Sequence, residues 1–453
     1  MENALKQYIE LYRQHSGLVS RNAPEAMNAL RDEALNILEE KGLPAKGSEN
    51  YEVTDMPGIL APDYGLNINR LPLDVNPAAS FRCGVPHLST SLFFLINDMF
   101  ARSSSSRSEI QEGVEVGSLA TCLKEDEAGK KFYGKIADIA NPIVALNTLF
   151  AQDGLFIRIK KGVKLKKPLQ LVSILQNSLP LMAVRRILII VEENAEGQLL
   201  VCDHTQNPDI DMMSLQVIEI VAQSGSRFDI YDLEESSRKT SRLSALYLHQ
   251  EEDSNVLIDG MTLFNGVTRN EYHTVFRGEN AELKLLGMGV ETENSFLSNY
   301  SFINHSVGHC FTDELFKYIV EDEAVGAFVG TIYVAPGAVK TEAFQTNRNM
   351  VTSPSARMFS KPQLEIYNDD VKCSHGSATG QLDAMQLFYM RSRGLSEEEA
   401  NLLLKQAFMA DVIDGVRIPM LRDRLVSLVE KRFVGESVMC ADCDICPSPK
   451  PTV

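Results

Sequence analysis

Long apolar runs are scarce in this sequence. Near the N-terminus the densest apolar stretch is Leu-Phe-Phe-Leu-Ile at positions 92–96, which is far shorter than the roughly 20 residues that a membrane-spanning helix needs. The first residues, Met-Glu-Asn-Ala-Leu-Lys, also lack the basic and then apolar order of a secretory signal. We therefore expect a protein of the cytoplasm that does not enter membranes.

Basic charge is in short supply as well. The chain has 44 Lys and Arg residues against 61 Asp and Glu residues, which gives a formal net charge of −17 at pH 7. A charge of this sign repels the phosphates of nucleic acids and anionic lipid headgroups at long range. Neither nucleic acid nor a membrane surface is an expected partner.

Nucleotide-binding motifs are missing too. The sequence contains no Gly-x-x-x-x-Gly-Lys-Ser/Thr loop and no Gly-x-Gly-x-x-Gly before a helix, so neither ATP nor a dinucleotide has an evident binding loop. We predict that the chain by itself neither hydrolyses ATP nor binds it tightly.

Cysteine does not occur in the pattern of a secreted, disulfide-bonded domain. Five of the eight cysteines are isolated in the sequence, so reduced thiols are expected. The other three, Cys440, Cys443 and Cys446, have the two-residue gaps of a ferredoxin-type cluster motif, but no fourth cysteine follows. Two interpretations remain open: a disordered tail with spare thiols, or thiolates that transiently bind sulfur, iron or a cluster.

The chain does contain the apolar residues of a large folded protein. Of its residues, 44% are hydrophobic and 23% are charged, values that are normal for globular proteins. A length of 453 residues is enough for about three domains. Residues 1–134 read as an N-terminal helical and loop region, in which Pro24 begins a helix that Gly42 ends. Within this region, the Ser-rich run at 102–107 has the composition of a flexible linker.

From residue 135 to 382 the pattern changes to short strands. The clearest β-forming runs lie at 155–159, 188–191, 199–202, 228–231 and 283–286. Gly266, Gly287, Gly308 and Gly330 are separated by 21, 21 and 22 residues, a spacing typical of a solenoid whose coils repeat the same corner. We therefore predict a mainly β protein with a β-helix core, whose ends and unpaired edges can receive another subunit.

The sequence pattern of residues 383–435 predicts helices. Residues 436–453 are the cysteine-containing tail. Ser396 and Glu399 make a capping box, and Pro419 opens a further helix. The apolar residues of the capped helix are predicted to share one face: Ala400, Leu403, Leu404, Ala407, Phe408 and Val412. Three short helices bury too little area to be stable alone, so they should pack on the β-helix or on a partner.

A thiol and an imidazole stand two residues apart where the strand pattern ends, at Cys373 and His375. In an extended chain, residues two apart point to the same face. Spacing alone would favour a core cysteine and a core histidine. The same explanation suits a second concentration, formed by His305, His309 and Cys310, in which the two histidines would share a strand face.

A β-helical carbohydrate-active enzyme is a rival class. It would need a pair of carboxylates facing each other across a groove. Asp369 and Asp370 are adjacent, so on a strand they would point to opposite faces and make a poor acid and base pair.

Longer motifs point elsewhere. The run Asp-Asp-Val-Lys-Cys-Ser-His-Gly at 369–376, followed by Leu-Phe-Tyr-Met-Arg-Ser-Arg-Gly at 387–394, resembles the C-terminal signature of the SufB/SufD family, the scaffold proteins of SUF iron–sulfur cluster assembly. Segments 330–334 and 344–350 and residue His305 match as well. The run after Lys372 is more similar to the SufD branch than to the SufB branch. Departures are Ser377-Ala378, where the family more often has Ala-Thr, and Glu314, where Gln is usual.

The resemblance implies a right-handed β-helix and a non-catalytic scaffold subunit that works with SufB and with the ATPase SufC. Five residues of the C-terminal helices are then expected to dock SufC: Leu387, Phe388, Leu403, Leu404 and Phe408. His375, with Cys373 as its neighbour, would lie at the SufB-facing end, where an imidazole can bind iron beside a thiolate of SufB. No cofactor is expected to bind tightly, and iron or a cluster would be held there transiently. The alternative is a SufB-like or homodimeric scaffold that bears the cluster itself.

Overall fold

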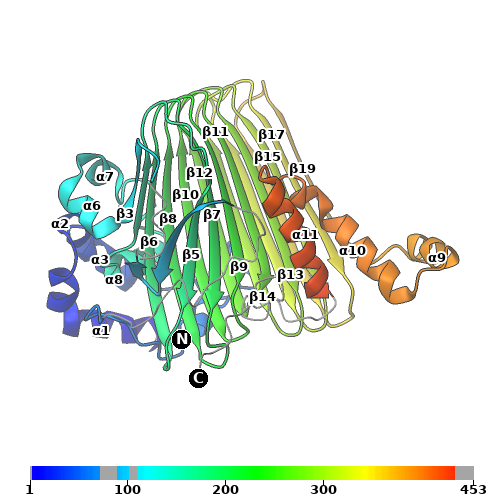
Figure 1. Ribbon diagram of the computed structural model, residues 1–453, viewed down its shortest axis with the longest axis horizontal. Coiled ribbons are helices and arrows are strands. Elements are labelled where there is room, and N and C mark those ends of the chain that lie inside the picture. Colours follow the sequence, from blue (N-terminus) through cyan, green and yellow to red (C-terminus); the bar gives the residue numbers. More distant parts are fainter. Residues whose placement is uncertain (1–2, 72–88, 102–109, 434–453) are drawn as a thin grey trace.

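The computed structural model describes residues 3–71, 89–101 and 110–433. Its centre is a β-solenoid in which the chain passes alternately through two facing sheets (Figure 1). Sheet A has the strand order β18-β16-β14-β12-β10-β8-β6-β4-β3, and sheet B has the order β19-β17-β15-β13-β11-β9-β7-β5-β1-β2. The prediction of a mainly β solenoid flanked by helices is confirmed.

Nearly all neighbouring strands are parallel, and only the pairs β1 with β2 and β3 with β4 are antiparallel. The strands of sheet A are β3 Val114–Ser118, β4 Leu155–Ile159, β6 Leu181–Val191, β8 Met212–Ala222, β10 Thr240–Gln250, β12 Val267–Phe276, β14 Phe296–His305, β16 Val325–Val334 and β18 Arg357–Ile366. Those of sheet B are β1 Ser91–Ile96, β2 Met99–Ala101, β5 Leu169–Leu175, β7 Glu196–Thr205, β9 Arg227–Glu235, β11 Asn255–Phe264, β13 Glu282–Glu291, β15 Phe311–Val320, β17 Glu342–Val351 and β19 Lys372–Gly380. Each of the five β-forming runs identified in the sequence lies in one of these strands.

The predicted repeat length is wrong. Val267 pairs with Phe296, Phe296 with Val325 and Val325 with Arg357, so successive coils are 29, 29 and 32 residues long. The four regularly spaced glycines do not share a corner, because Gly287 and Gly330 lie inside strands while Gly266 and Gly308 lie in turns. Their spacing is a coincidence among the 28 glycines of the chain.

Strands also begin earlier than predicted, since β1 and β3 lie within the first 134 residues. β1 pairs with β5, so that Ser91 meets Leu169. A strand whose partner is about eighty residues away leaves little local signal, and its apolar run reads simply as a short hydrophobic patch. Conversely, the helix α8 (Pro142–Phe150) falls within the segment predicted as strands.

Helices from the N-terminal part cover the outer face of sheet A (Figure 1). They are α1 Asn3–Arg21, α2 Glu25–Asn28, α3 Arg31–Lys41, α4 Met56–Ile59, α6 Leu119–Glu125, α7 Glu127–Phe132 and α8. The buried Arg31 side chain donates to the carbonyls of Thr148, Leu149 and Ala151 at the end of α8. It therefore satisfies backbone groups that the helix end leaves unpaired. The helix predicted from Pro24 to Gly42 is confirmed as two pieces, α2 and α3.

Residues 51–54, which we call the strap, lie against the outer face of sheet A. The Tyr51 hydroxyl donates to Glu271 of β12 at 3.0 Å, and Arg269 of β12 lies 4.0 Å from the Tyr51 ring centroid. Glu52 pairs with Lys361 of β18 at 2.6 Å. The strap thus connects the N-terminal helices to one of the last strands of the solenoid.

The C-terminal helices are α9 Ala384–Ser392, α10 Glu397–Ile413 and α11 Pro419–Phe433. The predicted capping box at Ser396 and Glu399 is confirmed, with both hydrogen bonds present. α10 and α11 pack on the outer face of sheet B, where Met409, Val412 and Leu425 join the apolar outer residues of the sheet. None of the helices in the described ranges is both long and apolar enough to span a membrane.

One carboxyl group lies under these helices without a partner. Asp259 of β11 is fully buried, and neither of its carboxyl oxygens has a hydrogen-bond partner in the part of the chain that the structure describes. Its neighbours across the sheet are Tyr231 and Leu286. Both touch the turn between α10 and α11: the Arg417 amide donates to the Tyr231 hydroxyl, and a Cβ on Gly415 would lie 2.3 Å from Leu286. Burial raises the pKa of Asp259 to about 8.

Two predicted segments lie outside the described residues. These are the Ser-rich linker at 102–107 and the tail with Cys440, Cys443 and Cys446.

Candidate functional site

The candidate site is the end of the solenoid formed by β18 and β19. These strands are the last members of sheet A and sheet B, so each pairs through only one of its edges. Side chains that would be interior in an earlier coil are exposed here, as the burial of β19 shows: eight of its nine residues are exposed. We call this surface the open end.

Cys373 and His375 both lie on β19 and face the interior side of the open end. Cys373 pairs with Ala343 and His375 pairs with Gln345 of β17, whose side chains are buried inside the solenoid. Paired residues of a parallel sheet share a face. Cys373 is partly covered and packs against the core, where burial raises the pKa of its thiol. His375 is exposed.

Hydroxyl and amide groups continue this inner surface beyond His375. Ser377 of β19 and Ser360 of β18 lie opposite each other with their Oγ atoms 2.7 Å apart, and Ser360 donates to the Asn347 side chain at 2.7 Å. The last coil is therefore closed by small polar contacts between the two sheets, while the imidazole of His375 remains accessible.

A polar ladder runs inward from His375. Gln345 lies next to His375 in sheet B, and Glu314 of β15 lies next to Gln345. Gln345 donates through Nε2 to Glu314 Oε2 at 2.7 Å, and both residues are fully buried. Burial raises the pKa of Glu314 to about 7, while polar contacts from Ser301 and Gln345 oppose this rise. Sequence reasoning missed Gln345, although it stands in the 344–350 motif, because its role depends on strand pairing.

The histidines and cysteine near residue 305 belong mostly to the core, as predicted. His305 is buried in β14, stacks on Phe276 with ring centroids 4.4 Å apart, and shares a hydrogen bond with Thr312 at 3.0 Å. Burial lowers the pKa of His305 to about 3 and raises that of Cys310 to about 11. The predicted shared strand face is wrong, because His309 lies in the turn after β14 with a φ of 60°.

The helix α9 carries an exposed apolar surface. It buries none of its residues and projects away from the solenoid beyond α10 (Figure 1). Met385 is 74% exposed, Phe388 69% and Tyr389 58%, and Leu387 is half-buried. Together with Leu403 of α10, which is 43% exposed, this surface offers aromatic and aliphatic contacts of the kind that anchor protein interfaces. Met385 and Tyr389 were not among the predicted residues.

The predicted apolar face of α10 needs correction. Its buried residues are Ala400, Met409, Val412 and Ile413, whereas Leu403 and Ala407 are exposed and Leu404 is half-buried. Phe408 packs against the cluster under the helices. Lys317 of β15 binds the carbonyl of Phe408 at 2.6 Å and lies 4.9 Å from its ring centroid. Phe408 therefore helps to hold α10 on the solenoid.

The carbohydrate-enzyme alternative gains no support here. Asp369 and Asp370 lie in the turn before β19, and Asp370 pairs with Lys340 at 2.8 Å. Within residues 3–71, 89–101 and 110–433, no three His, Cys, Asp or Glu side chains gather as a group that could hold a metal ion.

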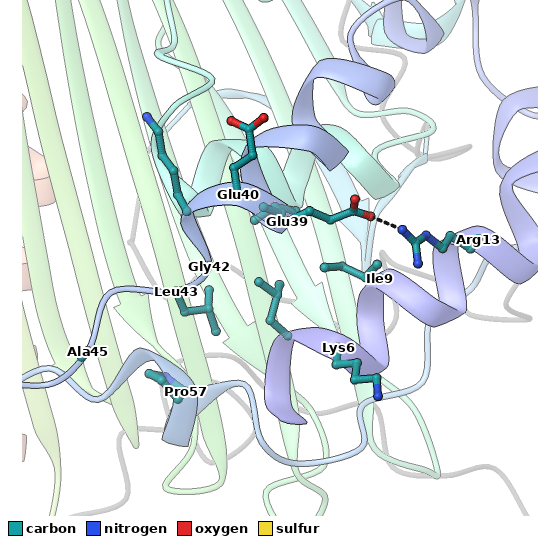
Figure 2. A pocket seen from close by; sticks show the side chains of 12 residues that line it. Lys6, Ile9, Arg13, Glu39, Glu40, Gly42, Leu43, Ala45 and Pro57 are labelled. Carbon is teal, nitrogen blue, oxygen red and sulfur yellow. Dashed lines mark hydrogen bonds and ion pairs between the residues drawn. The ribbon is translucent and has the colours of Figure 1, made fainter. Parts of the chain in front are cut away.

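A separate pocket of about 600 Å³ lies between α1, α3 and the chain leading to α4. Figure 2 shows Arg13 and Glu39 on its wall, joined by an ion pair of 2.6 Å. The lining presents charges of both signs, and none of the predicted site residues belongs to it.

Two family models match this sequence. A model described as SUF system FeS cluster assembly, SufBD core domain, matches residues 174–408, and one described as the SufBD protein N-terminal region matches residues 2–171. The core model covers the solenoid from the end of β5 to the middle of α10, including both strands of the open end.

Relatives with similar sequences support the same grouping. The iron–sulfur cluster assembly protein SufD of Escherichia coli is 27% identical over 450 residues, which is 96% of this chain and 97% of that protein. An iron–sulfur cluster assembly SufBD family protein of Synechocystis is 27% identical over 415 residues, 89% of this chain and 90% of the relative. SufD of Bacillus subtilis is 26% identical over 299 residues, 64% and 66% of the two chains.

Proposed function

The chain belongs to the SufBD family of SUF system iron–sulfur cluster assembly proteins, and on that premise we propose that it is a non-catalytic scaffold subunit. It pairs with a SufB-type chain through the open end and docks a SufC-type ATPase on its C-terminal helices. The iron or nascent cluster is its cargo, held transiently at the junction of the two scaffold chains.

The observation that carries this proposal is the exposed inner face of β19 with His375 on it. An edge strand has unpaired backbone groups that a strand of another chain can complete. The same strand presents an imidazole, which is a suitable iron ligand, from a face that would be buried in an earlier coil. In this proposal, a second chain supplies the further ligands of a cluster at this end.

The C-terminal helices suit an ATPase dock because they divide into two parts. α10 and α11 are fastened to sheet B by a shared apolar cluster and by Lys317, while α9 stands free with its aromatic residues exposed. Movement of a partner bound to α9 can be transmitted to α10 and, through α10, to sheet B. ATP-driven closure of a SufC pair would then rearrange the junction of the scaffold chains and expose ligands buried there.

We expect Phe388→Asp to abolish co-purification with the SufC-type ATPase. Phe388 is 69% exposed in the structure, so its replacement removes little packing. A charge buried in the interface costs several kcal/mol, so binding should weaken about a hundredfold or more. The measurement is affinity co-purification of the co-expressed subunits, followed by calorimetry.

Leu179→Asp is the matched control, because Leu179 is 68% exposed and lies in the loop between β5 and β6. It should bind the ATPase like the unmodified chain. Phe408→Asp should instead lower the melting temperature, since Phe408 packs on the solenoid. Undiminished ATPase binding by Phe388→Asp would show that the dock lies elsewhere.

The alternative is a SufB-like or homodimeric scaffold. An open end can pair with a second copy of itself as well as with a paralogue, so the isolated chain can dimerise through β19. Co-expression with a SufB-type chain separates the two, because a heterocomplex that displaces the homodimer supports the proposal, whereas a homodimer that persists and carries the cluster supports the alternative.

A further inference from the structure

The polar ladder leads from the buried interior of the solenoid to the exposed His375. Glu314, Gln345 and His375 occupy neighbouring positions on β15, β17 and β19, and their side chains lie on the inner face of sheet B. The first two are fully buried, while the third is exposed. A contact that Glu314 makes can therefore affect His375 only through the side chain of Gln345, which lies between them.

Glu314 sets the orientation of the Gln345 amide. Gln345 Nε2 donates to Glu314 Oε2 at 2.7 Å, so the nitrogen of the amide faces Glu314. Once the amide nitrogen faces Glu314, the oxygen on the same planar group faces away from it. The amide also packs tightly against the opposite wall, since a Cβ on Gly330 would lie 2.4 Å from Gln345 Nε2.

The amide oxygen of Gln345 has no partner. Oε1 is buried, and none of the described residues donates a hydrogen bond to it. A buried acceptor that is left unpaired destabilises the fold. The neighbour on the outer side of Gln345 is His375, whose ring carries N–H groups and whose exposed side chain is free to change rotamer.

We propose that Gln345 is a positioning residue for His375: its amide oxygen accepts a hydrogen bond from an imidazole N–H, and Glu314 holds the amide in the orientation that permits it. This inference rests on the proposed function, because it concerns the imidazole that is expected there to bind iron. A neutral imidazole that donates through one nitrogen keeps its lone pair on the other. The ladder thus selects one tautomer and aims the ligating nitrogen away from the solenoid, as partners of metal-binding histidines do.

NMR of the isolated chain labelled with ¹⁵N-histidine tests this directly, with His375→Gln identifying the signal. In Gln345→Leu, the tautomer ratio of His375 should move toward that of free histidine, because the acceptor is gone. In Gln345→Glu, an acceptor remains beside the imidazole, so the ratio should stay closer to that of the unmodified chain. Glu314→Gln should act in the same direction as Gln345→Leu but less strongly, because a glutamine at 314 no longer fixes the direction of the neighbouring amide.

Thr331→Ala is the matched control. Thr331 of β16 lies on sheet A, and its hydroxyl donates to Gln363 at 3.3 Å rather than to a ladder residue, so its loss should leave the tautomer ratio of His375 unchanged. An equal tautomer ratio of His375 in the unmodified chain and in Gln345→Leu would overturn the proposal. Because these spectra need neither iron nor a partner, they are independent of the cluster assay that tests His375 as a ligand. Melting temperatures of all variants show that each one is folded.

Discussion

Replacing His375 with alanine is expected to leave the chain folded and its subunits assembled, but to lower cluster formation on the complex by roughly tenfold or more. His375 is exposed at the open end, so its loss removes no core packing. It does remove the one imidazole of β19, and the nearest side chain on the same face that could bind iron is the Cys373 thiol. Cluster absorbance after reconstitution, measured together with melting temperature and co-purification, checks this expectation.

Cys373→Ala provides the comparison from the same strand. Cys373 packs partly against the core, and burial raises the pKa of its thiol, so less of it is thiolate at neutral pH than in an exposed cysteine. We expect a milder loss of cluster and a small loss of stability. A stable His375→Ala complex that assembles clusters at the normal level would end the ligand hypothesis.

The second large effect concerns Asp259, for which we expect Asp259→Leu to stabilise the chain by roughly 2 kcal/mol or more near pH 7.5. Its buried carboxyl has a pKa of about 8 in the folded chain and an ordinary value of about 3.9 when unfolded. As pH rises from about 4 to 8, the unfolded state releases this proton while the folded state retains it. The stability of the unmodified chain should therefore fall over this range, by at most about 1.4 kcal/mol per pH unit from this group.

Denaturant titrations at several pH values measure this contribution. Asp259→Leu fits the apolar neighbours of the site and should make the fall in stability between pH 4 and 8 less steep. Asp259→Asn cannot ionise, so it should flatten the curve to a similar extent but stabilise less, because a polar group remains buried without a partner. The expectation fails if the pH profile of either variant matches that of the unmodified chain.

The same substitution, Asp259→Leu, should strengthen the packing of α10 and α11 on sheet B. Asp259 lies between Tyr231 and Leu286, which touch the turn joining α10 and α11. If this turn moved away from sheet B, water would reach the carboxyl group of Asp259 and the group could ionise. The buried carboxyl therefore makes detachment of α10 and α11 from sheet B easier than an apolar side chain would. Hydrogen exchange in α10 and α11 should slow in Asp259→Leu.

Local signals in the sequence predicted those parts of the structure that local interactions determine. Ser396 and Glu399 predicted the start of α10, because a capping box lies within one helical turn. Cys373 and His375 could be placed on one strand face from their spacing of two. In both cases the residues that matter are near each other in the chain.

Features that depend on distant partners were not predictable in this way. The coil length of 29 to 32 residues follows from strand pairing, and the glycine spacing suggested a shorter one. The role of Gln345 requires knowing that β17 lies between β15 and β19. Likewise, the inward side of α10 is decided by sheet B, which buries Met409 and leaves Leu403 outside.

The strap has a consequence for the order in which the chain folds. A solenoid can grow coil by coil as it leaves the ribosome, because each coil rests on the one before it. The strap is an exception to this order. The ion pair of Glu52 with Lys361 can form only after Lys361 has been synthesised, 309 residues later. At a synthesis rate of about 5–20 residues per second, that delay lasts roughly 15 to 60 seconds. Tyr51 needs only β12, since its partner Glu271 follows after 220 residues, so the strap attaches in two steps: Tyr51 on β12 first, and Glu52 on β18 last.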